Sequence, residues 1–454
     1  MISFLPIGGG NEIGANSYHL NFNGNGVILD CGIHPQKAGL DSLPNFDLLK
    51  DKPVDYCLIT HAHQDHIGSL PFLVKRFPYV KIITAPQTRA LAELTLHNSV
   101  SILKKEIEKP DFEFYSHDEV DLLIKMIEYK EYQNEFELNS YHQQKEAKVN
   151  CTFYDAGHIL GSAGILLENN NHKIFYTGDI NLSAQTLLPG ACLPETKVDT
   201  LVLETTYGAT DSELLLDWNS ESFRFAKEAN KILNNGGSIL IPVFSLGKMQ
   251  EMLATIWHLM QKRKLTTVDI YTGGLGTKIS RAYDYNRFVV NRVDEEFELN
   301  TIPQKDYYEI SNPEEFFRHP CIVLASSGMM IKSTSSFTFA KRWLKQKDSA
   351  IFTVGYMDTK TPGHVIANSE RGDKIQLTEY DESTEVKCEI KNFKFSAHAR
   401  REDLLKIVDK QKPDNVILTH GDEDALDWMG SSILKKHKNL KVHTAIPGKE
   451  IEIL

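Results

Sequence analysis

The stretch YCLITHAHQDH (residues 56–66) places four possible metal ligands directly after a short apolar run that is typical of a strand. Alternation of an extended backbone brings His61 and His63 to one side, while Asp65 and His66 lie where a helix would begin. Imidazole nitrogens and carboxylate oxygens suit zinc, and the two pairs predict two zinc ions rather than one. A polar turn with solvated histidines is the simpler alternative, but this string is far more specific than a single histidine.

Three further candidate ligands also follow apolar runs. His158 comes directly after TFYDAG (152–157), Asp179 after IFYTG (174–178), and His420 after NVILT (415–419). In α/β proteins the loops at the carboxyl ends of strands line a common crevice. We therefore expect these side chains to complete the zinc sites, although each taken alone would more often be a structural turn residue.

The composition is that of an ordinary globular chain and excludes several classes of protein. Its 454 residues are 41% hydrophobic and carry 50 Lys and Arg against 61 Asp and Glu, a net charge of −11. These values exclude a disordered, collagenous or coiled-coil chain and a generally basic protein that coats nucleic acid. The six cysteines are spread singly, which predicts reduced thiols and no Cys-rich zinc site. We see no signal peptide or membrane-spanning run, and we expect a cytoplasmic protein.

Short apolar strands alternate with helical patterns along the chain, which indicates the α/β class. The pattern of strands and helices changes after Tyr207-Gly208. From there, predicted strands such as GGSILIPVF (236–244) and PCIVLASSG (320–328) are each followed by a helix, as in a doubly wound unit. The candidate ligands resume only at the end of the chain. We therefore predict one domain formed by residues 1–208 and 395–454, with a second domain, residues 209–394, inserted into it.

With these motifs the sequence resembles the metallo-β-lactamase superfamily, whose fold is an αββα sandwich. The resemblance implies a ligand set for each of two zinc ions: His61, His63 and His158 for one, and Asp65, His66 and His420 for the other, with Asp179 bridging them. It also implies that Asp30, in ILDCG (28–32), supports the histidine loop from behind.

The resemblance narrows to the β-CASP branch of that superfamily. Glu204 in LVLETTYG (201–208), His398 in FKFSAHA (393–399) and His420 match the three extra motifs of this branch, and the likeness covers essentially the whole chain. Members of the branch are zinc-dependent RNA-processing nucleases in which an inserted doubly wound α/β β-CASP domain caps the metal site. The resemblance thus implies endo- or exonucleolytic hydrolysis of single-stranded RNA by a hydroxide held between the metals.

Three residues receive catalytic roles by this resemblance. His398 is expected to protonate the leaving oxygen, Glu204 to orient its imidazole, and Asp65 to act as both ligand and catalytic residue. For Glu204, a solvated acid at a strand end is the alternative.

Substrate contacts are expected in the inserted domain, where the sequence also departs from the branch. Lys248 stands where an Arg often begins a β-CASP helix, and YTGGLGTK (271–278) replaces an Asp-Ser-Pro sequence. Lys248, near a helix N-terminus, and the Ser326-Ser327-Gly328 turn could bind phosphate. A solvated lysine and an ordinary turn are the alternatives.

Two other functions remain open at this stage. One is a small-molecule hydrolase of the superfamily, such as a thioesterase or lactonase, and the other is a catalytically silent scaffold that has lost its metal. The sequence also leaves open the choice of RNA or DNA, the direction of cleavage and the oligomeric state, a homodimer included.

Overall fold

The computed structural model describes residues 2–22, 24–37, 39–106, 115–139, 148–169, 171–355 and 357–453. These residues form two compact units. The first unit comprises residues 1–183, 190–214 and 398–454, and the second comprises 184–189 and 215–397. In the described part of the chain, no helix combines the length and the apolar character needed to cross a membrane.

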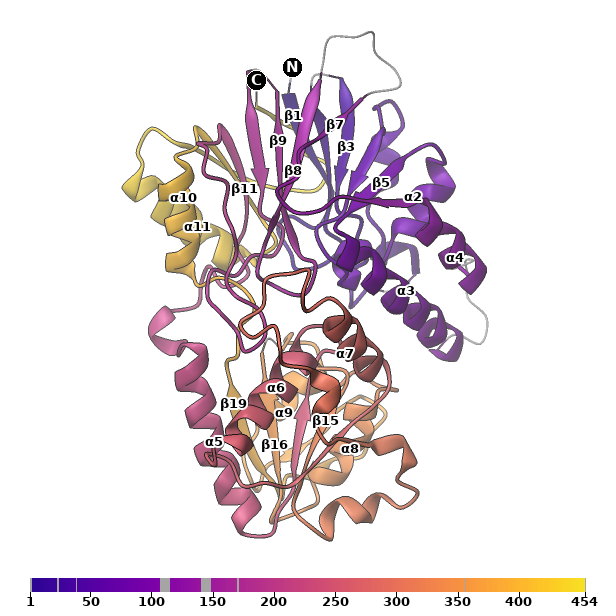
Figure 1. Cartoon of the computed structure of the whole chain (residues 1–454), viewed down its shortest axis with the longest axis vertical. Coiled ribbons are helices and arrows are strands. Elements are labelled where there is room, and N and C mark those ends of the chain that lie inside the picture. The colour runs from indigo at the N-terminus through magenta and orange to yellow at the C-terminus, as the bar shows by residue number, and fades with distance from the viewer. Residues whose placement is uncertain are drawn as a thin grey trace. The chain divides into compact units, whose positions relative to one another are not determined.

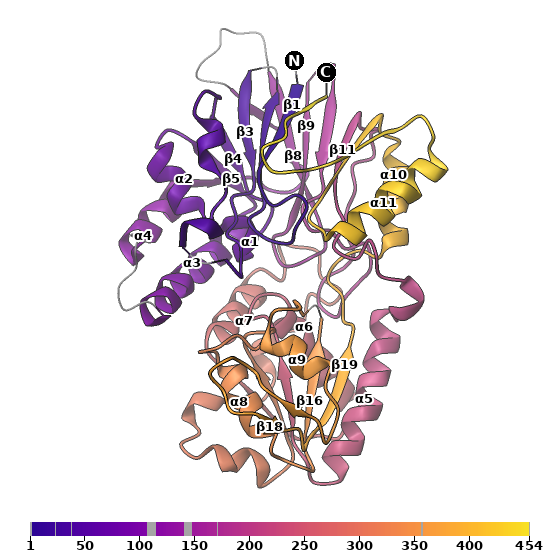
Figure 2. The same cartoon turned by 180° about the vertical axis from the view of Figure 1, so that it is seen from behind.

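The first unit contains two seven-stranded sheets (Figures 1 and 2). In spatial order, one sheet consists of β22 (Ile451–Glu452), β1 (Ile2–Gly8), β2 (Ser17–Phe22), β3 (Asn25–Leu29), β4 (Tyr56–Leu58), β5 (Lys81–Thr84) and β6 (Ile127–Tyr129). The other consists of β21 (Lys441–Thr444), β20 (Asn415–Thr419), β11 (Thr200–Glu204), β10 (Lys173–Tyr176), β9 (Ala163–Glu168), β8 (Val149–Asp155) and β7 (Phe136–Leu138).

One buried core joins the two sheets face to face. It combines side chains of β1 to β4, such as Phe4 and Leu58, with side chains of β8 to β11, such as Phe153 and Val202. Alternate residues of the second sheet, such as Phe175 and Leu203, point to a separate core on its other face, which they share with α10 and α11. Each sheet of the sandwich therefore buries one face against the other sheet.

Helices cover the outer faces of the sandwich. Four helices lie on the side of the first sheet: α1 (Gln64–Ile67), α2 (Leu70–Arg76), α3 (Pro86–Glu106) and α4 (His117–Met126). Two lie on the side of the second sheet: α10 (Arg401–Gln411) and α11 (Glu423–Lys436). The capping box that the sequence predicts at the start of α4 is present: Ser116 accepts the backbone N–H of Glu119, whose carboxylate accepts that of Ser116. The arrangement is an αββα sandwich.

The second unit is built on a six-stranded parallel sheet. Its order is β14 (Lys305–Asp306), β13 (Asp269–Thr272), β15 (Cys321–Ala325), β12 (Ile239–Pro242), β16 (Ala350–Val354) and β19 (Glu389–Phe393). A separate pair, β17 (Lys374–Ile375) and β18 (Thr384–Glu385), completes the strands of this unit. The helices are α5 (Trp218–Asn234), α6 (Lys248–Gln261), α7 (Leu275–Tyr285), α8 (Ser335–Trp343) and α9 (Pro362–Ala367).

Helices lie on both faces of this parallel sheet. On one face Ile351 packs in a core with Trp343 of α8 and Ile366 of α9. On the other face the next residue of β16, Phe352, meets Phe225 of α5 with 5.7 Å between ring centroids. Parallel strands buried on both faces are typical of a doubly wound unit, as the sequence predicts. The predicted fold class, an αββα sandwich together with a doubly wound α/β unit, is confirmed.

A short segment from the middle of the ligand series belongs to the second unit. Residues 184–189 are held by the buried carboxylate of Glu251 in α6, which accepts the backbone N–H groups of Thr186, Leu187 and Leu188 at 2.8, 2.8 and 3.2 Å. The side chain of Trp218 adds a hydrogen bond to the Thr186 hydroxyl at 2.8 Å. The chain therefore crosses between the units four times, after residues 183, 189, 214 and 397.

Replacing Glu251 should loosen this segment. In Glu251→Ala three backbone N–H groups lose their acceptor, and we expect the free energy of unfolding to fall by about 2–4 kcal/mol. The measurement is chemical denaturation with hydrogen exchange at pH 8, above the value of about 7 to which burial raises the pKa of Glu251. The amides of residues 186–188 should exchange faster. Glu228→Ala, which removes only a partly exposed pair with Lys231, should change stability by less than about 0.5 kcal/mol. Unchanged exchange in Glu251→Ala would contradict the role of this carboxylate.

Candidate metal centre

The candidate ligands lie in loops at the carboxyl ends of strands. His61 follows β4 by three residues, Asp179 follows β10 by three, and His420 comes directly after β20. The strand before each of these ligands is short and largely buried, and its end leads into the loop that carries the ligand. The fold therefore delivers residues far apart in the sequence to one edge of the sandwich.

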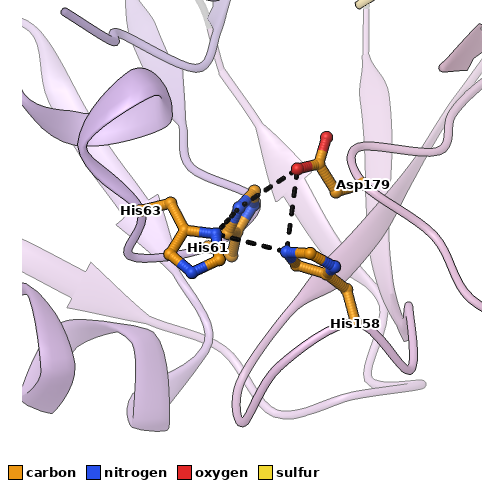
Figure 3. A group of neighbouring side chains, drawn as sticks. All are labelled: His61, His63, His158 and Asp179. Atoms are coloured by element: carbon orange, nitrogen blue, oxygen red, sulfur yellow. Dashed lines mark hydrogen bonds and ion pairs between the residues drawn. The ribbon is translucent and has the colours of Figure 1, made fainter. Parts of the chain in front are cut away.

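Three histidines, which we call the first ligand group (His61, His63 and His158), face one another around one oxygen of Asp179 (Figure 3). His63 Nδ1 lies 3.1 Å from His61 Nε2 and 3.2 Å from His158 Nε2. Asp179 Oδ2 lies 3.5 Å from His61 Nε2 and 3.7 Å from His158 Nε2. Ligands bound about 2.1 Å from a tetrahedral zinc ion are about 3.4 Å apart, so this spacing fits one such ion.

Three more residues, the second ligand group (Asp65, His66 and His420), gather around the other oxygen of Asp179. Asp65 Oδ2 lies 3.4 Å from His420 Nε2 and 3.6 Å from His66 Nε2. Asp179 Oδ1 lies 3.5 Å from His66 Nε2 and 3.2 Å from His420 Nδ1. Each oxygen of Asp179 thus faces a different ligand group.

A cation fits this donor set. Asp179 is 3% exposed, and its Oδ1 accepts no hydrogen bond from the described residues. A buried carboxylate oxygen without a donor is costly, whereas a metal ion supplies the missing positive charge. Zinc takes nitrogen and carboxylate ligands of this kind, in this number.

The electrostatics of the two ligand groups differ. Burial lowers the pKa of His61 well below its ordinary value, aided by the neighbouring His66, so its imidazole is neutral and keeps a lone pair. Burial would raise the pKa of Asp179, but His420 and His66 outweigh it and hold the pKa well below the usual range. Burial also opposes the charged form of His66, yet Asp179, Asp65 and Asp30 together raise its pKa well above 6.5. A cation in the second ligand group would therefore lie among more carboxylates than a cation in the first ligand group.

Asp30 supports the histidine loop, in the place that the sequence resemblance implies. It is fully buried, and its carboxylate accepts the backbone N–H of Thr60 at 2.7 Å and contacts His66 Nδ1 at 2.8 Å. Its φ of 58° lies in the left-handed region, which aspartate tolerates better than most residues. Hydrogen bonds of this type fix the ring orientation of a metal-binding histidine.

Glu204 and His398 form a pair beside Asp179. His398 Nδ1 lies 3.0 Å from Glu204 Oε1, which also accepts the backbone N–H of Ile180 at 2.9 Å. Glu204 is 1% exposed, so the alternative of a solvated acid is wrong. The His398 ring lies 4.5 Å from that of His158, centroid to centroid, and is partly exposed. The pair therefore borders the ligand groups and keeps access to solvent.

The four residues expected to bind substrate lie in the second unit. Lys248, the first residue of α6, is buried: its Nζ donates to the Phe395 carbonyl and lies 5.0 Å from the centroid of the Trp218 ring. Burial lowers its pKa to about 8, although Glu251 acts in the opposite direction, and the alternative of a solvated lysine is wrong.

The turn Ser326-Ser327-Gly328 follows β15 and is tied to the start of α8. The Ser326 carbonyl accepts the backbone N–H of Ser336 at 2.9 Å, and the Ser327 carbonyl accepts the Ser336 hydroxyl at 2.6 Å. Gly328 packs against Phe244, whose ring would lie 3.0 Å from an added Cβ. Both serines are partly exposed, and the Ser327 hydroxyl accepts the backbone N–H of Ile331 at 3.3 Å.

Family models match three parts of the chain. Residues 10–128 match the metallo-β-lactamase superfamily, residues 249–366 the β-CASP domain, and residues 383–447 a Zn-dependent metallo-hydrolase RNA specificity domain. The two compact units described above contain the first two matches, one in each.

Named relatives match along nearly the whole chain. The cleavage and polyadenylation specificity factor subunit 3 of Dictyostelium discoideum is 30% identical over 98% of this chain and 56% of its own length. An RNase J-like protein of Methanocaldococcus jannaschii is 29% identical over 97% of this chain and 96% of its own length. The endoribonuclease YSH1 of Yarrowia lipolytica is 28% identical over 97% of this chain and 52% of its own length. The chain thus spans little more than half the length of the eukaryotic relatives.

A solved structure shows the same fold over the same extent. A protein of unknown function from Enterococcus faecalis V583 superposes with a TM-score of 0.55 over 99% of both chains, at 12% sequence identity. The same family is indicated by the matched models, the αββα sandwich, the two ligand groups and the Glu204–His398 pair. The chain belongs to the β-CASP branch of the metallo-β-lactamase superfamily.

Proposed function

We propose that this chain is a two-zinc phosphodiesterase that cleaves single-stranded RNA. The observation that carries the proposal is Asp179, whose two oxygens face two separate groups of three His and Asp side chains. The first ligand group would hold one zinc ion, the second ligand group the other, and Asp179 both. When bound, the ions would supply Lewis acidity towards a phosphate and activate a water molecule for attack.

The Glu204–His398 pair supplies the proton that the leaving oxygen needs. Glu204 Oε1 accepts the Nδ1–H of His398, which fixes the orientation of the ring. Nε2 of the same ring then carries the proton that we assign to the leaving oxygen. The 2.9 Å hydrogen bond from the Ile180 N–H holds the Glu204 carboxylate in place.

RNA is the substrate that the relatives support. One matched model is described as an RNA specificity domain, and one relative is named an endoribonuclease and another an RNase J-like protein. The net charge of −11 requires local attraction of a polyanion, which two divalent ions would provide at the site of cleavage.

Three finer assignments belong to this proposal. The β-CASP domain that the sequence predicts at residues 209–394 corresponds to most of the second unit, and the metallo-β-lactamase domain predicted at 1–208 and 395–454 to the first unit. The serine hydroxyls of the Ser326-Ser327-Gly328 turn contact substrate phosphate, because the turn follows the carboxyl end of a parallel strand. Lys248, which the sequence predicts as a phosphate contact, already donates its ammonium group to the Phe395 carbonyl. Its proposed role is therefore to hold this part of the second unit in place for the substrate.

The test uses single-stranded RNA and DNA labelled at the 5′ or the 3′ end. The zinc-loaded protein should cut RNA, and internal fragments or single nucleotides will identify endo- or exonucleolytic cleavage. The Asp179→Ala variant is the control for a contaminating nuclease. Turnover of thioesters or lactones without cleavage of either nucleic acid would overturn the proposal in favour of a small-molecule hydrolase. A wild-type protein that binds no zinc would support a scaffold.

A further inference from the structure

We propose that Tyr176 is a positioning residue for the second ligand group. Through Asp30 it would hold the His66 ring so that the lone pair of Nε2 faces Asp65 and Asp179. The inference rests on the proposed function, because it assumes that this group binds a zinc ion.

The contacts of Asp30 determine which nitrogen of His66 carries the proton. The Asp30 carboxylate accepts the Thr60 hydroxyl at 2.9 Å and the Tyr176 hydroxyl at 2.7 Å, in addition to the contact with His66 Nδ1 at 2.8 Å. An ionised carboxylate only accepts hydrogen bonds, so Nδ1 must be the donor. With a zinc ion bound the ring would be neutral, and its lone pair would then be on Nε2, the atom that lies 3.6 Å from Asp65 and 3.5 Å from Asp179.

A second chain of hydrogen bonds reaches the same ring from the opposite side. The Tyr18 hydroxyl donates to Asn16 Oδ1 at 2.8 Å, which turns Nδ2 of that amide towards His66 Nε2 at 3.1 Å. An amide nitrogen only donates, so Nε2 must accept. Both chains therefore favour the form of His66 with the proton on Nδ1 and the lone pair on Nε2, and a bound zinc ion would take the place of the Asn16 amide at that lone pair.

The core fixes the Tyr176 phenol. Its ring is 3% exposed and meets the Tyr18 ring edge-on, with centroids 5.9 Å apart and planes at 82°. Tyr18 in turn stacks on Phe4 at 5.3 Å. The Tyr176 hydroxyl and His66 Nδ1 share one oxygen of Asp30, Oδ2. Without the hydroxyl this oxygen loses a donor in a fully buried place, and the carboxylate that orients His66 keeps the contacts with Thr60 and His66 but loses its contact with the opposite sheet.

The first ligand group is linked to Asp30 less directly. His61 Nδ1 lies 3.0 Å from the Thr60 hydroxyl, which in turn donates to Asp30. His158 is in a separate loop, and its backbone N–H donates to Ser162 at 3.1 Å. Loss of the Tyr176 hydroxyl should therefore weaken the metal held by His66 much more than the other. This asymmetry separates a positioning role from a general loss of stability.

The experiment titrates metal-free protein with zinc in competition with a chromophoric chelator. Wild type should bind two ions. In Tyr176→Phe one ion should bind nearly as in wild type and the other about 10-fold or more weakly, because contacts behind a ligand are commonly worth 10–100-fold in metal affinity. Tyr56→Phe is the matched control. It also removes a buried phenol of the same core, one that donates to the Asn139 carbonyl at 3.1 Å, and it should bind both ions as wild type does.

A double-mutant cycle with Asp30→Asn shows whether Tyr176 acts through Asp30. An amide donor opposite His66 Nδ1 reverses the preferred tautomer, so Asp30→Asn should itself weaken one ion, and adding Tyr176→Phe should weaken it no further. Melting temperatures of the metal-free variants report whether each protein is folded.

Each outcome bears on a different claim. A wild type without zinc overturns the proposed function. Two ions bound equally well by wild type and Tyr176→Phe overturn the positioning role alone. Equal weakening of both ions, an equal effect of Tyr56→Phe, or additive effects of Tyr176→Phe and Asp30→Asn would also overturn it. Should Tyr176→Phe fail to fold, the titration of Asp30→Asn still decides: retention of both ions at wild-type affinity would overturn the proposal.

Discussion

Asp179→Ala should leave the purified protein with neither zinc ion. Its two oxygens face the two ligand groups at 3.2–3.7 Å, so removing this one carboxylate leaves both groups without a ligand. It also removes a negative charge that would balance the charge of each zinc ion. The measurement is elemental analysis of protein purified without chelators. Two ions at full occupancy in this variant would show that the ligand assignment is wrong.

A matched control separates loss of a ligand from loss of a carboxylate. Asp199, in the same unit, accepts the backbone N–H of Lys173 at 2.7 Å and lies outside both ligand groups. Asp199→Ala should retain both ions. Loss of zinc from this control would mean that the sandwich tolerates no such change, and the Asp179 result would then say nothing about coordination.

His398→Ala should keep both zinc ions and the fold but lose activity by roughly 10²–10⁴-fold. The two ligand groups and Asp179 account for seven side chains, and His398 contacts Glu204 rather than completing either group. Hydrolysis of labelled RNA by zinc-loaded protein measures the loss. Zinc analysis of the same sample tests whether the residue is a ligand instead.

The leaving group distinguishes an acid from a binding residue. An activated aryl phosphodiester releases an oxygen that needs little protonation, so the defect of His398→Ala should shrink on that substrate. Glu204→Gln should show the same selectivity more weakly, because Glu204 acts through the imidazole. An equal loss on activated and natural substrates would refute the acid role.

The sequence predicts which side chains gather into the two ligand groups, because each of them follows an apolar strand. An apolar strand followed by His or Asp specifies both the type of ligand and its place at the edge of a sheet, as for His61 and His420. Of the three supports of His66, the resemblance implies only Asp30. Asn16 and Tyr176 could not be predicted, because they lie at the ends of strands in different sheets and meet His66 and Asp30 only after the sheets pack.

Lys248 shows the same limit in the second unit. Its place at the start of a helix can be predicted, but its burial depends on Phe395, which lies 147 residues further on, and on Trp218. A charge pattern alone does not tell a solvated lysine from one enclosed by distant segments.

The crossing of residues 184–189 into the second unit limits how modular this architecture is. Only residues 180–183 separate Asp179 from the segment that Glu251 holds. A deletion of residues 215–397 would therefore remove Glu251, which holds the loop that begins at Asp179. A graft of residues 215–397 onto another sandwich would bring Glu251 without the backbone N–H groups that it accepts. The insert and this loop must be exchanged, shortened or evolved together.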